Sequence, residues 1–84
     1  MSGKQSRTLV AIFANPVRSD LSWKDIESLL AALGAEISEG KGSRVRFWLN
    51  GVRAVFHRPH PRKTTDKGAV VSMRRFLEQA GVKG

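Results

Sequence analysis

Residues 44–57 read RVRFWLNGVRAVFH, and this stretch decides the fold. Two runs in which apolar and polar residues alternate flank Asn50-Gly51, a dipeptide typical of a two-residue type I′ hairpin turn. Such a turn fixes the register of its strands, placing Leu49 opposite Val52 and each following pair one step further out. The sequence therefore predicts an antiparallel hairpin with a defined pairing.

The predicted register sorts the hairpin side chains onto two faces, because successive residues of a strand point to opposite sides. The pairs on the first face are apolar and are expected in the core: Leu49 with Val52, Phe47 with Ala54 and Val45 with Phe56. The pairs on the second face carry arginine, tryptophan and histidine: Trp48 with Arg53, Arg46 with Val55 and Arg44 with His57. Opposed side chains in a sheet lie about 4.5–5.5 Å apart at Cβ.

The charge of the chain indicates what this second face could bind. The 84 residues include 15 Lys and Arg against 7 Asp and Glu, for a formal net charge of +8. An excess of this size on a small domain favours nucleic acid as the partner. A plainer interpretation is that positive charges keep an exposed sheet soluble.

Length and composition restrict the remaining classes. A chain of 84 residues is expected to form one domain, here residues 8–84 after a disordered polar tail over residues 1–7. No cysteine is present, which suits a reducing cytoplasm, and no apolar run approaches the roughly 20 residues of a membrane span. We expect a cytoplasmic protein without membrane contact.

Helical patterns lie on both sides of the hairpin. Thr8 can cap a short helix that Asn15-Pro16 stops, and Ser22 with Asp25 approximates a capping box before a helix that Gly34 ends. Residues 35–39 suggest a strand, residues 58–63 a basic loop, and residues 64–66 the cap of a last helix that ends at Gly81. An outward ion pair between Arg74 and Glu78 is expected on that helix.

The expected order is helix, helix, three antiparallel strands, helix. It predicts an α+β fold in which the helices pack on one face of the sheet, leaving the arginine-bearing face open. This order resembles the double-stranded RNA-binding fold.

Short stretches along the chain also carry a family resemblance: residues 25–30 (DIESLL), 33–35 (LGA), 39–43 (EGKGS), 60–61 (HP) and 75–82 (RFLEQAGV). Taken in order, they resemble the HicA family of bacterial mRNA-cleaving toxins over roughly residues 9–82. The resemblance implies a ribosome-independent endoribonuclease that uses no metal and is held inactive by a HicB antitoxin.

One position departs from the family pattern. In the family a Gly-Ser turn leads into a strand that carries the catalytic histidine, whereas here Gly42-Ser43 precedes Arg44. The predicted register places His57 across from Arg44, so we interpret His57 as the general base for a ribose 2′-hydroxyl. Arg44 and Arg46 would stabilise charge on the phosphate. Alternatively, His57 only ends its strand, and the protein is a silent RNA-binding or antitoxin-binding module.

Further RNA contacts are predicted around this centre. Trp48 beside Arg53 could stack on a base or simply cover the end of the sheet. The loop residues expected to contact RNA, unless they are only solvated, are Arg58, His60, Arg62 and Lys63. His60 could instead shape its loop.

Metal and DNA are weaker expectations. His57 and His60 lie three residues apart, but no cysteine and no carboxylate falls between Glu39 and Asp66, so we expect neither a metal nor another cofactor. DNA binding is less favoured because neither main helix is basic enough to enter a groove.

Overall fold

The computed structural model describes residues 1–60 and 62–83, so Pro61 of the predicted His60-Pro61 motif lies outside the described residues. The elements follow in this order: α1 (Gly3–Ile12), β1 (Leu21–Ser22), α2 (Trp23–Ala32), β2 (Glu36–Glu39), β3 (Arg44–Leu49), β4 (Val52–His57), β5 (Thr64–Thr65) and α3 (Lys67–Gln79). The fold is α+β and of the double-stranded RNA-binding type, which confirms the predicted class.

The hairpin forms as its sequence predicts. Strands β2, β3 and β4 make one antiparallel sheet in that order, and all six predicted β3–β4 pairs are present, from Leu49↔Val52 to Arg44↔His57. Asn50 and Gly51 both adopt positive φ, 50° and 81°, as a type I′ turn requires. Asn50 also donates from Nδ2 to the carbonyl of Ala80 at 2.8 Å, which ties the turn to the end of α3.

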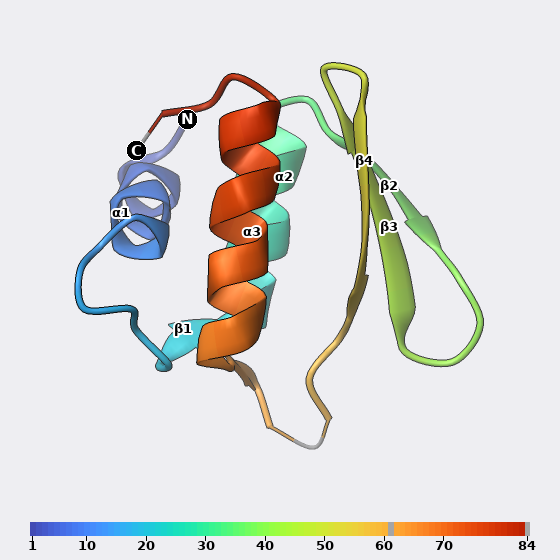
Figure 1. Ribbon diagram of the computed structural model, residues 1–84, viewed down its shortest axis with the longest axis horizontal. Helices are drawn as coiled ribbons and strands as arrows, with labels where there is room; N and C mark the ends of the chain where they lie inside the picture. The colour runs from blue at the N-terminus through green and yellow to red at the C-terminus, as the bar shows by residue number, and fades with distance from the viewer. Residues whose placement is uncertain (61, 84) are drawn as a thin grey trace.

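The molecule has three layers. Helices α2 and α3 lie against one face of the three-stranded sheet, and α1 lies on their far side, away from that sheet (Figure 1). The fully buried core side chains are Ile12, Ile26, Leu29, Leu30, Val45, Phe47, Val70, Met73 and Leu77. Burying a side chain of this kind contributes about 1.5–3 kcal/mol. Val45 and Phe47 of this set come from the hairpin and the others from the three helices, so the stability depends on packing between the helices and the sheet.

An aromatic cluster joins the sheet to both covering helices. The ring of Phe47 lies 6.1 Å from Trp23 in α2, 5.7 Å from Phe56 in β4 and 6.4 Å from Phe76 in α3, measured between centroids. The rings are tilted against one another, the arrangement that aromatic pairs prefer. Trp23 therefore belongs to the core.

The N-terminal helix begins earlier than the sequence predicted. Thr8 does not cap it; α1 starts at Gly3, because Ser2 Oγ accepts from the backbone N–H of Gln5 while the Gln5 side chain accepts from the Ser2 N–H. Most of the polar stretch over residues 1–7 is thus helical.

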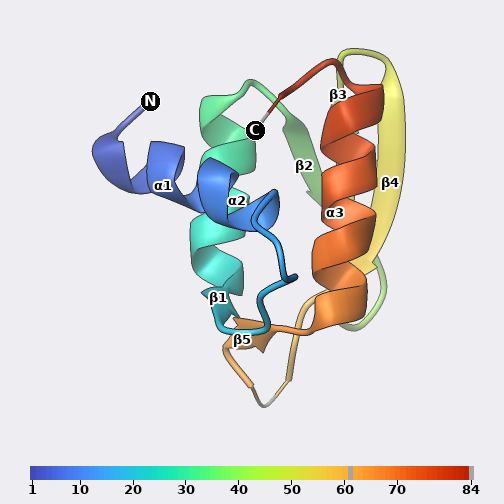
Figure 2. The same ribbon diagram turned by 60° about the vertical axis from the view of Figure 1, so that its left-hand side comes forward.

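Two smaller expectations were also wrong, and one pair of short strands was not expected. The Ser22 side chain makes no capping hydrogen bond at α2, although Asp66 does cap α3 by accepting from the N–H of Ala69 at 2.7 Å. Two short strands, β1 and β5, pair with each other below α2 (Figure 2). Arg74 does not pair with Glu78: its guanidinium donates to the carbonyls of Ile12 and Ala14 at 3.0 and 2.9 Å.

Candidate functional site

The open face of the sheet carries the predicted set of side chains. Arg44, Arg46, Arg53 and His57 are exposed, and two large apolar side chains, Trp48 and Val55, remain 46% and 57% exposed beside them. We call these six residues the cationic sheet face. In the part of the chain that the structure describes, no helix covers this face, because α2 and α3 both pack on the opposite one (Figure 1).

Arg44 and His57 form the last cross-strand pair of the hairpin, at the end opposite the turn. The backbone N–H of Arg58 donates to the carbonyl of Ser43 at 2.9 Å, which keeps the two strands together just beyond this pair. An imidazole and a guanidinium thus start from directly opposed backbone positions and point to one side of the sheet. The two side chains are therefore close enough to contact the same phosphodiester group.

Trp48 and Arg53 form a second unit nearer the turn. The Arg53 guanidinium lies 4.8 Å from the centre of the Trp48 ring, within the range of a cation–π interaction. Beside them is a hollow of about 460 Å³, whose lining also includes Arg46 and Val55 and, from β2, Glu36 and Ser38. An exposed indole next to guanidinium groups offers both a stacking surface and positive charge, which suits an unpaired base with its phosphate.

Arg58 lies on the other side of β4, although the sequence suggested a phosphate contact. Its guanidinium donates to both carboxylate oxygens of Glu27, at 2.7 and 3.1 Å, and also pairs with Glu39. The indole N–H of Trp23 donates to the same Glu27. These hydrogen bonds, first those to Glu27 and then those to Glu39, raise the pKa of Arg58 above its usual value. Its charge is therefore largely satisfied within the protein.

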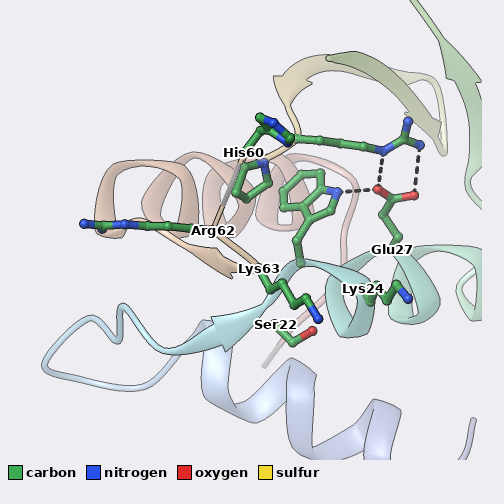
Figure 3. A pocket seen from close by; sticks show the side chains of 9 residues that line it. Ser22, Lys24, Glu27, His60, Arg62 and Lys63 are labelled. Carbon is green, nitrogen blue, oxygen red and sulfur yellow. Dashed lines mark hydrogen bonds and ion pairs between the residues drawn. The ribbon is translucent and has the colours of Figure 1, made fainter. Parts of the chain in front are cut away.

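A cleft of about 680 Å³ opens where the loop after β4 passes the start of α2. The residues that line it are Ser22, Trp23, Lys24, Glu27, Arg58, Pro59, His60, Arg62 and Lys63. Figure 3 shows Ser22, Lys24 and Lys63 on the side of α2, Glu27 in its hydrogen bonds, and Arg62 extending outward from the loop. We call this space the loop cleft.

The structure thus divides the sequence-predicted residues between two places. Arg44, Arg46, Trp48, Arg53 and His57 share the cationic sheet face, whereas the loop residues His60, Arg62 and Lys63 belong to the loop cleft. Sequence reasoning missed Lys24 and Glu27, because a helical pattern does not say which loop packs beside the helix. It could have placed Arg58, since side chains alternate along β4 and His57 points outward.

Residues 1–60 and 62–83 were searched for a metal-ligand cluster and for membrane-spanning helices. Within these ranges no three His, Cys, Asp or Glu side chains gather as a possible ligand set. In the same part of the chain, the helices are all too short or too polar to cross a membrane.

A three-stranded antiparallel sheet with helices on one face is the architecture of the double-stranded RNA-binding type of fold, and in this basic chain the other face carries cations. The family model described as the HicA toxin of bacterial toxin-antitoxin matches residues 23–82, so the chain belongs to this family. The resemblance seen in the sequence is confirmed, and membership implies an antitoxin partner. Comparisons with curated proteins and with solved structures found no match.

Proposed function

We propose that this toxin is a metal-independent endoribonuclease that cleaves mRNA and so blocks translation. The observation that supports it best is the pairing of His57 with Arg44 at the end of an uncovered cationic face, in a chain of the HicA family. A group that accepts a proton near neutral pH stands beside groups that stabilise negative charge. Transesterification at an RNA phosphate needs both.

In the proposed reaction, the imidazole of His57 takes the proton from a ribose 2′-hydroxyl. The 2′-oxygen attacks the adjacent phosphorus, the bond from phosphorus to the 5′-oxygen breaks, and that oxygen takes a proton from water. The products are a 2′,3′-cyclic phosphate and a 5′-hydroxyl end. Arg44 and Arg46, fixed on β3, stabilise the extra charge on the phosphate as the 2′-oxygen attacks.

Binding of RNA rests on the rest of the exposed cations. Trp48 with Arg53 provides the stacking surface, and Arg62 and Lys63 provide phosphate contacts from the loop. The same cationic sheet face suits the antitoxin, which we propose to be of the HicB type and to cover this face through an acidic surface.

The decisive experiment replaces the proposed base. His57→Gln is expected to lower the rate of RNA cleavage about 100-fold or more, because a general base supplies roughly 10²–10⁴-fold. His60→Gln serves as the matched control, a histidine three positions along, and is expected to lose much less. Circular dichroism and RNA affinity of the His57 variant should match the unaltered protein, since the side chain is exposed.

A rescue variant makes the assignment sharper. In the His57→Gln background, Arg44→His is expected to restore part of the activity, because the two side chains share one cross-strand position on the open face. EDTA should leave the rate unchanged. Full cleavage by His57→Gln would falsify the assignment of the base.

A second candidate is a binding module without catalysis, favoured by one observation: position 44, which follows the Gly42-Ser43 turn, holds arginine. This candidate predicts RNA or antitoxin binding with no cleavage by the protein itself. It stands if neither the unaltered chain nor the Arg44→His variant cuts RNA that it binds.

A further inference from the structure

We propose that the loop cleft binds one nucleotide of the RNA, next to the nucleotides joined at the cut. This inference rests on the proposed function, which it deepens by adding a second binding site on the other side of β4 from the cationic sheet face.

The size and charge of the loop cleft favour a small anion-bearing ligand. Its volume of about 680 Å³ falls within the roughly 300–1,000 Å³ of small-molecule sites. Lys24, Arg62 and Lys63 bring positive charge to it. The one carboxylate in its lining, Glu27, is already neutralised by the two hydrogen bonds from Arg58. The cleft therefore keeps a net positive charge.

The cleft also has an apolar wall, which a bare phosphate does not need. Trp23 is only 6% exposed, so a small part of this residue lines the cleft, together with Pro59. Ser22 and His60 add hydrogen-bonding groups. A nucleotide combines a flat base, which has apolar faces and hydrogen-bonding edges, with a charged phosphate, and so matches this mixture of apolar wall, polar groups and cations.

Backbone hydrogen bonds bring the chain segments that carry the two lysines together. The N–H of Trp23 donates to the carbonyl of Lys63 at 3.0 Å, so the loop is attached directly to the first residue of α2. Ser22 pairs with Thr64 in the β1–β5 ladder. The backbone at Lys63 and at the start of α2, far apart in sequence, is thus joined before any ligand binds, which lowers the entropic cost of binding.

The position of the cleft relative to His57 makes it a neighbouring subsite. His57 is the last residue of β4, and Pro59 and His60, which line the cleft, follow two and three positions later. Extended chain spans at most about 3.3–3.6 Å per residue, so the cleft begins within about 10 Å of His57. A strand cut on the sheet face can pass around the end of β4 and place its next nucleotide in the cleft.

The two tryptophans allow a direct test by NMR. The protein is labelled with ¹⁵N and titrated with adenosine 3′,5′-bisphosphate while the indole N–H signals of Trp23 and Trp48 are followed separately. We expect a saturable shift of the Trp23 signal. The double variant Lys24→Gln, Lys63→Gln should weaken this binding at least 10-fold, whereas Lys83→Gln, an exposed lysine outside the cleft lining, should not.

Several results would overturn the inference. A Trp23 signal that does not shift, or one whose titration is unchanged in the double variant, shows that the cleft does not hold the nucleotide. Equal affinity for inorganic phosphate indicates a bare anion site, and equal affinity for a glutamate-rich peptide indicates a protein site. The titration measures binding and not cleavage. Its result is therefore independent of the cleavage assay of His57→Gln, and failure of one proposal can be told apart from failure of the other.

Discussion

At the scale of single residues, Arg58 shows where sequence reasoning reaches its limit. The residue lies in a basic run and was expected to contact phosphate, but the structure surrounds it with Glu27 and Glu39. Glu27 is 31 positions earlier in the chain and reaches Arg58 only because α2 packs under the sheet. The residues around Arg58 in the sequence do not indicate that it pairs with Glu27. The outward direction of the His57 side chain, in contrast, follows from the alternation of side chains along a strand.

Removing the carboxylate of Glu27 should cost stability. Glu27→Gln leaves the half-buried guanidinium of Arg58 and the indole N–H of Trp23 with a weaker acceptor, for which we expect a loss of about 1–3 kcal/mol in the free energy of unfolding. Urea denaturation measures it. Glu78→Gln, an exposed carboxylate on α3, is the control and should change the midpoint little. If both variants were equally stable, the Glu27 carboxylate would not contribute to the free energy of unfolding through Arg58 and Trp23.

At the scale of elements, predictability follows the range of the interactions. The β3–β4 hairpin and the left-handed ends of α2 and α3, at Gly34 and Gly81, were predicted because adjacent residues determine them. The start of α1 was missed although Ser2 and Gln5 have capping-box spacing. Strands β1 and β5 span two residues each, too few for any periodicity, and only the tertiary fold brings them together.

One arginine of α3 attaches this helix to α1: the guanidinium of Arg74 donates hydrogen bonds to the carbonyls of Ile12 and Ala14. Arg74→Leu removes these charged donors from the C-terminal end of α1. Each such bond contributes about 1–2 kcal/mol, so we expect amide hydrogen exchange in α1 to become about 10-fold faster or more. Arg75→Leu, the exposed neighbour, provides the control and should leave α1 protection as it is.

At the scale of the whole molecule, the net charge of +8 predicts how RNA binding responds to salt. The exposed cations proposed to contact phosphate are Arg44, Arg46, Arg53, Arg62 and Lys63. If these neutralise about five phosphates of a single strand, the slope of log K against log salt should be about −3.5. A titration with potassium chloride measures it, and an affinity independent of salt would remove nucleic acid as the main ligand.

The hydrogen bond from Asn50 to the end of α3 indicates whether the protein or the bound nucleic acid changes shape on binding. It anchors the tip of the hairpin to the helical layer, so the strands that carry the cations of the open face do not bend easily to follow a ligand. Any polyanion that binds there has to bend its own backbone to meet them. A pliable single strand can do this at little cost, whereas a stiff duplex must be deformed, so unstructured stretches of a message are the better fit.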